Sequence, residues 1–266
     1  MINPFFSIIT VTKNCQDTIT QTLNSVKIQS FKDYEHIVID GFSNDETFKI
    51  IQNYKSDKII KKQIKDHSCF EGLNNAHKYI NGKYVILLHS GDLLYSSETL
   101  EKIKKNIDEK VDLLIYNCVF YNKEKKIKRI WFINEKNLNL RNCFLIPHTA
   151  TIMNTKVLDE IGNYNLNFKI ASDTEYILRI FKNKKINYII SNEFLCFMRL
   201  GGLSTNFRFM MKKIIEDLKI YLTFFGKKKF ILIYLKKIFI KVKQFGNIRG
   251  REIHNKLLLV LLKKIN

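Results

Sequence analysis

Two acidic residues stand where a carboxylate could take part in chemistry. Asp92 ends the run KYVILLHSGD, residues 83–92, and Asp173 lies within KIASDTEYILRIF, residues 169–181. A carboxylate at the exit of a buried strand has a fixed backbone, so it can hold a metal ion or a substrate hydroxyl. Asp92 could equally be a turn or capping acid, because the following SSETL contains a capping signal of its own. Position alone leaves both interpretations of Asp92 open.

The elements around these acids alternate between strand and helix. Short β-branched runs predict strands at 5–12, 34–40, 58–64 and 83–90, and apolar residues at helical spacing predict helices at 17–30, 48–54 and 70–80. This order predicts a parallel sheet, which binds ligands outside the carboxyl ends of its strands. The polar residues at those ends are Thr12 to Asn14, Asp40 to Ser43, Asp66 with His67, and His89 to Asp92.

Composition places the chain among folded intracellular proteins. Its 266 residues suffice for one large domain, or for one domain with an appendage, and 45% of them are hydrophobic. The five cysteines are scattered and form no C-x-x-C pair, which favours a reducing cytosol over a disulfide framework. The start MINPFFSIITVTKN has neither the basic region nor the cleavage site of a signal peptide. We therefore expect a cytoplasmic protein.

The net charge of +20 is concentrated late in the chain. From Arg208 onward there are 16 Lys or Arg and 3 Asp or Glu, which contribute +13 of the total. Lysines interrupt the apolar clusters FILIYLKKIFIKV and KLLLVLLKK before they reach the roughly 20 residues of a membrane span. This pattern favours basic amphipathic helices on an anionic membrane surface. The alternatives are a helical bundle edge with a solvated lysine face and nucleic-acid binding.

Seven segments together resemble family 2 glycosyltransferases of the kind that assembles bacterial surface polysaccharides. They occur in the family's order and spacing: SIITVTKN, HIVIDGFSNDET, IKDHSCFEGLNNA, VILLHSGD, PHTATIMN, ASDTEYILR and RLGGLSTN. The resemblance implies an α/β fold of the GT-A type, with a Rossmann-like, mostly parallel central sheet flanked by helices. It also implies a nucleotide-sugar donor and, usually, a divalent cation. We expect this domain at 1–206 and a basic amphipathic helical extension that associates with the membrane at 207–266.

The resemblance assigns seven residues to the nucleotide sugar. Thr12 and Asn14 match the turn that wraps the base, Asp40 the acid that accepts a hydrogen bond from base or ribose, and Asp66 and Asn74 the segment that closes over the nucleoside. His148 matches a histidine on the donor or acceptor side, and Arg199 with the turn GGLSTN suits the diphosphate. For Asp40, Asp66 and Asn74 a turn or capping role remains the alternative.

The HSGD segment departs from the family, which typically has an acid-rich cluster there. Gly91 replaces one acid and His89 takes the leading position, so Asp92 is the carboxylate that remains. A cation can use one or two protein carboxylates when diphosphate oxygens and water complete its shell. We therefore expect Mg²⁺ or Mn²⁺ at Asp92, with His89 as a second ligand; a weak metal site or none is the alternative.

Asp173 matches the family's catalytic base. It would take the proton of an acceptor hydroxyl while that oxygen displaces the nucleoside diphosphate in one inverting step. Glu175, two residues on, is the weaker candidate, and a favourable dipole contact in the first helical turn is the structural alternative for Asp173. The expected acceptor is a glycan or a lipid-linked glycan at the inner face of the cytoplasmic membrane.

Other classes of protein fit the sequence less well. No G-x-G-x-x-G follows the first strand, which argues against a dinucleotide-binding oxidoreductase. We expect no nucleic-acid partner, because the strand ends are acidic and would repel phosphate. A basic nucleic-acid-binding protein and, because of Gly91, a catalytically weak relative remain the alternative functions.

Overall fold

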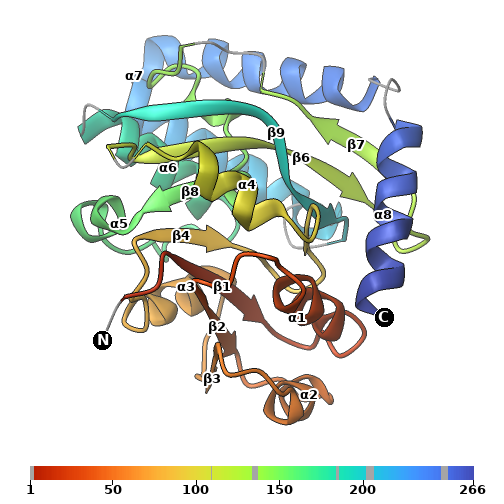
Figure 1. Cartoon of the computed structure of the whole chain (residues 1–266). Helices are drawn as coiled ribbons and strands as arrows, with labels where there is room; N and C mark the ends of the chain where they lie inside the picture. Colours follow the sequence, from red (N-terminus) through yellow and green to blue (C-terminus); the bar gives the residue numbers. More distant parts are fainter. Residues whose placement is uncertain (1–2, 109, 134–136, 184–185, 202–206, 247–250) are drawn as a thin grey trace.

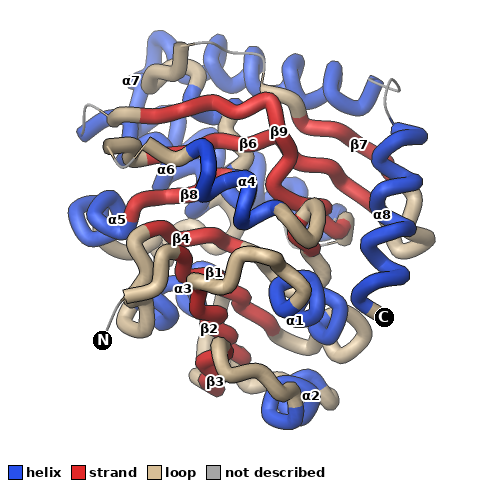
Figure 2. The backbone as a smooth tube through the Cα atoms, in the orientation of Figure 1, coloured by secondary structure: helices blue, strands red, loops and turns tan. Residues whose placement is uncertain are grey.

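The chain folds around one mixed sheet of nine strands (Figures 1 and 2). The structure, a computed structural model, describes residues 3–108, 110–133, 137–183, 186–201, 207–246 and 251–266. The strand order is β3-β2-β1-β4-β8-β6-β9-β5, and β7 pairs with β6. The α/β fold with a helix-flanked sheet agrees with the class expected from the sequence.

The first part of the sheet is parallel and places its carboxyl ends together. Its strands are β1 (Phe6–Thr12), β2 (Tyr34–Asp40), β3 (Ile59–Gln63) and β4 (Tyr84–Leu87). Helices α1 (Ile19–Lys27), α2 (Thr47–Asn53) and α3 (Cys69–His77) connect them. Every residue of β1 and β2 is buried, which explains why these strands read as continuous apolar runs in the sequence.

The second part of the sheet is built on the long strand β6 (Leu113–Tyr121). Strands β7 (Ile127–Trp131) and β8 (Thr151–Asn154) pair with it antiparallel, and β9 (Tyr188–Arg199) pairs with it parallel. The short strand β5 (Leu93–Leu94) follows the HSGD turn and pairs with β9. The remaining elements here are α4 (Thr99–Asn106), η1 (Cys143–Leu145), η2 (His148–Ala150), α5 (Thr155–Ile161) and α6 (Ser172–Asn183).

The C-terminal segment forms two helices that pack on the sheet domain. Helix α7 (Phe207–Gly246) is interrupted at Gly226, whose φ of 70° and ψ of 169° are not helical. Ile220 and Tyr221 of α7 are fully buried in the main core. Helix α8 (Arg251–Ile265) lies beside the β6–β7 hairpin (Figure 1), and Asn24 of α1 donates to the carbonyl of Ile265 at 2.6 Å. The extension thus shares its core with the rest of the chain.

No helix within the described residues is long and apolar enough to cross a bilayer.

Candidate active site

A cavity of about 530 Å³ opens at the carboxyl ends of β1 and β4. The turn after β4 and the end of β9 line one part of it, while η2, the start of α6 and two lysines of α7 line another. Six of the ten predicted site residues line this cavity: Thr12, His89, Asp92, His148, Asp173 and Arg199. The sheet therefore brings together side chains from five separate segments of the sequence.

Asp92 is held rigidly at one end of the cavity. Its backbone N–H donates to the His89 carbonyl at 2.9 Å, which closes the HSGD turn, and its Oδ1 accepts from the Arg199 N–H at 2.8 Å. The side chain is only 6% exposed, and burial raises its pKa to about 7 although the Arg199 hydrogen bond opposes this. A positive charge bound in the cavity would favour the ionised form of Asp92.

The glycine of HSGD has a local structural reason. Gly91 has a φ of +94°, a conformation that L side chains rarely adopt, and a Cβ there would lie 3.1 Å from Cδ of Arg199. The stem of Arg199 therefore occupies the space beside residue 91, where the family resemblance places a second acid. In place of that second acid, Arg199 brings a guanidinium to this end of the cavity.

The residues at this end suit a cation that is shared with a bound diphosphate. Asp92 offers one carboxylate, and burial lowers the pKa of His89 to about 4, which keeps its imidazole neutral as a metal ligand must be. Among the residues that the structure describes, no group of three or more His, Cys, Asp or Glu converges on one point. The donor set thus fits a site completed by diphosphate oxygens and does not fit one made by protein alone.

Asp173 lies at another part of the same cavity, in the first turn of α6. Burial would raise the pKa of this carboxyl, but Lys213, His148 and Lys237 outweigh burial and hold the pKa below its ordinary value. Oδ1 also accepts a hydrogen bond from the Thr174 N–H at 2.7 Å. Asp173 is therefore ionised at neutral pH and able to accept a proton.

Helix α7 fixes the segment that carries Asp173. Glu216, which is buried, accepts three backbone hydrogen bonds from the residues just before α6: Lys169 at 3.1 Å, Ile170 at 2.8 Å and Ala171 at 2.9 Å. Lys237 donates to Asp217 at 2.9 Å and lies 3.5 Å from the hydroxyl of Thr174. These contacts satisfy backbone donors at the start of α6 and place two lysine charges near Asp173.

His148 is oriented by an aromatic cluster next to Asp173. Its Nε2 lies 2.8 Å from the hydroxyl of Tyr164, and the Tyr164 ring stacks on Tyr176 with centroids 4.2 Å apart. Burial lowers the pKa of His148, while Asp173 acts in the opposite direction. His148 thus lines the cavity with one ring nitrogen held by the hydroxyl of Tyr164.

Two of the four remaining predicted residues stabilise the loops at the sheet's edge. Asn14, with a φ of 52°, accepts from the Asn44 N–H at 2.8 Å. Asp40 accepts from the Ser43 N–H and from Nε2 of Gln63, both at 3.0 Å. Neither lines the cavity as the structure describes it, and their contact with a nucleotide stays a prediction.

The other two lie beside or away from the cavity. Asp66 packs against Gly41 and is 3.9 Å from Nζ of Lys13, a cavity residue, so it lies directly behind the lining. Asn74 uses its amide to donate to the Tyr164 carbonyl at 3.1 Å and to accept from the Tyr164 N–H at 2.8 Å. The geometry gives Asn74 a structural task outside the cavity. Of the GGLSTN turn, residues 202–206 lie outside the described residues.

The hydroxyl of Thr12 is available for a hydrogen bond with a ligand. It ends β1 and lines the cavity, yet its hydroxyl is buried and has no hydrogen-bond partner among the described residues. A buried hydroxyl of this kind costs free energy unless a ligand or water satisfies it. The prediction that Thr12 contacts a ligand is therefore consistent with its surroundings.

The lining also includes cations that, apart from Arg199, the sequence analysis did not assign to the site. Among the described residues seven cationic side chains face two carboxylates in the cavity; the cations are Lys13, Lys123, Arg129, Lys169, Arg199, Lys213 and Lys237. Such a surplus attracts an anionic ligand such as a diphosphate. No periodicity distinguishes these lysines from the other basic residues, so the sequence carried little signal for them.

Comparison with known sequences identifies the family. Residues 7–162, more than half of the chain, match the family described as "Glycosyl transferase family 2". The chain belongs to glycosyltransferase family 2. A curated "PGL/p-HBAD biosynthesis glycosyltransferase" of Mycobacterium bovis is 27% identical over 187 residues, covering 69% of this chain and 72% of that protein. WfaP of Escherichia coli, a "UDP-Glc:alpha-D-GlcNAc-diphosphoundecaprenol beta-1,3-glucosyltransferase", is 30% identical and covers 65% and 67%.

Solved structures support the fold of this family 2 glycosyltransferase. TarS of S. aureus (residues 1–349) with UDP-GlcNAc has a TM-score of 0.68 at 18% identity, covering 98% of this chain and 82% of that one. A mannosyltransferase of Pyrobaculum calidifontis with GDP-Man and Mn²⁺ has a TM-score of 0.64 at 13% identity, covering 99% and 75%. At these identities the likeness concerns the fold.

Proposed function

We propose that the cavity transfers a sugar from a nucleoside diphosphate to an acceptor hydroxyl, with Asp173 as the general base. One observation supports this most: Asp92 and Asp173, far apart in the sequence, line the same cavity. A cavity of about 530 Å³ is within the size range of sites that enclose small ligands. Structural neighbours were solved with UDP-GlcNAc and GDP-Man, which supports a nucleotide-sugar donor.

The diphosphate of the donor would lie at the Asp92 end of the cavity. Arg199 presents a guanidinium there, and Thr12 has a free hydroxyl for the nucleotide. Asp92 and His89 would hold Mg²⁺ or Mn²⁺ together with the diphosphate oxygens. A cation in this place supplies positive charge to the leaving group. Arg199 supplies charge of the same sign from the protein.

The acceptor would lie at the Asp173 end. Its hydroxyl oxygen attacks the anomeric carbon and forms the new C–O bond, its proton passes to a carboxylate oxygen of Asp173, and the bond to the diphosphate oxygen breaks with its electron pair on that oxygen. The described lining holds two carboxylates, and one of them is assigned to the diphosphate end. This leaves no second carboxylate for a covalent glycosyl intermediate, which favours a single displacement with inversion.

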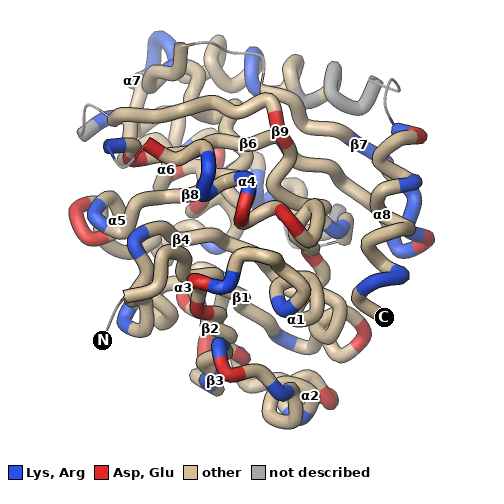
Figure 3. Tube along the Cα trace, viewed as in Figure 1, with Lys and Arg blue, Asp and Glu red and all other residues tan. Residues whose placement is uncertain are grey.

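The acceptor class follows from the relatives and from α7. WfaP is named for an acceptor on diphosphoundecaprenol. Here the second half of α7 presents a ridge of exposed apolar side chains at helical spacing: Leu232 (75% exposed), Leu235 (55%), Phe239 (59%) and Val242 (64%). Lysines surround this ridge, and Lys or Arg also recur along α8 (Figure 3). An apolar ridge with basic neighbours suits the surface of an anionic membrane.

We therefore place the protein as a peripheral enzyme at the inner face of the cytoplasmic membrane, adding a sugar to a lipid-linked glycan in cell-surface polysaccharide biosynthesis. The 1–206 glycosyltransferase domain and the 207–266 extension would act together, since α7 both carries the ridge and contacts the Asp173 segment.

Asp173→Asn tests the proposed base. The variant removes the proton acceptor and keeps the shape, so we expect transfer to fall by about 10² to 10⁴ while donor binding, followed by thermal stabilisation, persists. Asp159→Asn is the control, because Asp159 is 65% exposed on α5 and does not line the cavity. Transfer by Asp173→Asn at the wild-type rate would exclude Asp173 as the base.

A further inference from the structure

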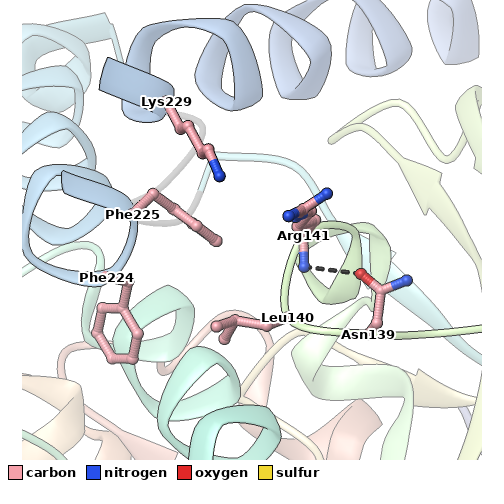
Figure 4. A pocket seen from close by; sticks show the side chains of 6 residues that line it. All are labelled: Asn139, Leu140, Arg141, Phe224, Phe225 and Lys229. Atoms are coloured by element: carbon pink, nitrogen blue, oxygen red, sulfur yellow. Dashed lines mark hydrogen bonds between the residues drawn. The ribbon is translucent and has the colours of Figure 1, made fainter. Parts of the chain in front are cut away.

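A second cavity, of about 480 Å³, lies between the loop before η1 and the break in α7. We call it the headgroup pocket; it is lined by Asn139, Leu140, Arg141, Phe224, Phe225 and Lys229. Figure 4 shows the cationic ends of Lys229 and Arg141 facing the same space, with Phe225 to one side and Phe224 and Leu140 below. The pocket thus combines two positive charges with an apolar floor.

The local backbone creates this arrangement. Gly226 interrupts α7, so that Phe224 and Phe225 before the break and Lys229 after it line one pocket. On the opposite side, the Arg141 N–H donates to Oδ1 of Asn139 at 2.9 Å, which shapes the loop that carries Arg141.

Neither Arg141 nor Lys229 has a carboxylate within salt-bridge distance in the described part of the chain. A third cation is near, since Nζ of Lys182 lies 5.4 Å from the centroid of the Phe224 ring. An arginine fork and a lysine together suit a phosphate group, and the aromatic floor suits the apolar atoms attached to it.

The position of Lys229 favours a membrane lipid as the source of such a phosphate group. Lys229 and Leu232 are three residues apart on α7, so they share a face of the helix, and Leu232 begins the exposed apolar ridge. A membrane that receives the ridge would therefore bring its headgroups to the level of Lys229 and Arg141.

We propose that the headgroup pocket binds the phosphate of an anionic phospholipid while the α7 ridge enters the membrane. This inference rests on the membrane contact in the proposed function and names its specific lipid contact. A chain of aromatic rings links the pocket to the active cavity: Phe225 packs on Tyr221 with ring centroids 5.6 Å apart, and Tyr221 packs at 6.1 Å on Phe144, which lines that cavity. A bound lipid would thus be connected through Tyr221 to the wall of the active cavity.

The test is co-sedimentation of the full chain with vesicles of phosphatidylcholine, with or without phosphatidylglycerol. We expect the wild type to bind the anionic vesicles, and Arg141→Gln combined with Lys229→Gln to lower that partitioning roughly thirtyfold. Lys102→Gln with Lys105→Gln on α4 changes the net charge equally and should leave partitioning unaltered. Transfer to a water-soluble acceptor should be the same in all three proteins, which shows that each is folded.

The outcomes separate the two proposals. If the wild type stays in solution with both kinds of vesicle, the membrane contact and the headgroup pocket are both refuted, while transfer by Asp173 is untouched. If the wild type binds and the Arg141→Gln, Lys229→Gln variant binds equally well, the headgroup pocket alone is refuted. Thermal stabilisation by inorganic phosphate that this variant loses, without any vesicle binding by the wild type, would show a site for free phosphate and refute the lipid as its source.

Discussion

Replacing Glu216 by Gln tests whether α7 is part of the catalytic architecture. Glu216 receives the N–H groups of Lys169, Ile170 and Ala171, and the last two share one carboxylate oxygen. A glutamine carbonyl can keep those two hydrogen bonds without the charge, but its NH₂ group then faces the Lys169 N–H. Hydrogen bonds to charged groups contribute about 1.5 to 3 kcal/mol each against about 1 for neutral ones. We expect Glu216→Gln to lower the free energy of unfolding by about 2 to 4 kcal/mol.

The same substitution should affect transfer through the position of Asp173. Ala171 precedes Asp173 by two residues, so a relaxed segment moves the base, and a displacement of about 1 Å can cost roughly 10² in rate. We expect kcat to fall while the KM for the donor changes little, because other elements form the Asp92 end of the cavity. Urea unfolding and initial rates of transfer measure the two effects.

Glu193→Gln is the matched control, since Glu193 is an exposed residue of β9 and does not line the cavity. It should retain wild-type stability and rate. If Glu216→Gln unfolds at the same urea concentration as this control and transfers sugar equally fast, then the three backbone hydrogen bonds do not position the base and the reasoning is wrong.

Two further outcomes are expected. Burial raises the pKa of Asp92 from 3.8 to about 7, so the folded protein favours the protonated carboxyl. The protonated carboxyl therefore costs no stability at about pH 4, whereas ionisation of the buried carboxyl lowers the free energy of unfolding as the pH rises through 7. In metal-free protein, Asp92→Asn should therefore become more stable relative to the wild type as the pH rises from 4 to 8, by the order of 4 kcal/mol. Thermal unfolding at several pH values measures this difference. A difference that stays constant from pH 4 to pH 8 would contradict the burial of an ionisable Asp92. Leu232→Glu with Leu235→Glu should reduce vesicle binding and spare transfer to a soluble acceptor; undiminished binding would place the membrane contact elsewhere.

The parallel half of the fold was predictable because its signal is local. The strands expected at 5–12, 34–40, 58–64 and 83–90 occur as β1 to β4 with ends shifted by a few residues. Buried parallel strands are apolar along their whole length, so a short stretch of sequence suffices to recognise them. The edge formed by their carboxyl ends then follows from topology, and it places Thr12 and Asp92 on one cavity.

Residues of α7 were not predictable in the same way. Helix α7 follows the last strand of the sheet in the sequence. Its residues Lys213, Glu216 and Lys237 come close to the Asp173 segment only in the folded chain. The segment from Arg208 onward contains 16 Lys or Arg, and the neighbouring sequence does not distinguish a lysine that lines a cavity from one in solvent. The sequence pattern of 207–266 indicated an appendage with a basic face, and the structure adds that two of its lysines lie near Asp173.

Asn14, Asp40 and Asn74 illustrate a different limit. Each is polar and lies near the end of a strand or at the start of a helix, which is where both ligand-binding groups and turn-forming groups occur. Their hydrogen bonds to Asn44, Ser43 and Tyr164 come from residues that sequence spacing does not relate to them, except for Ser43. Only the three-dimensional partners separate the two roles.

The departure at HSGD and the arginine at the end of β9 are parts of one local solution. Gly91 accepts a φ of +94° and leaves room for the Arg199 stem, and the Arg199 N–H in turn fixes the carboxylate of Asp92. An acid at residue 91 would have to displace that stem, because its Cβ alone would lie 3.1 Å from Cδ of Arg199. In the proposed reaction the diphosphate end thus gains the guanidinium of Arg199 where the family resemblance leads us to expect a second carboxylate. Arg199 can then help to stabilise the negative charge on the leaving group beside any cation at Asp92, so loss of an acid from this motif does not by itself indicate a loss of catalysis.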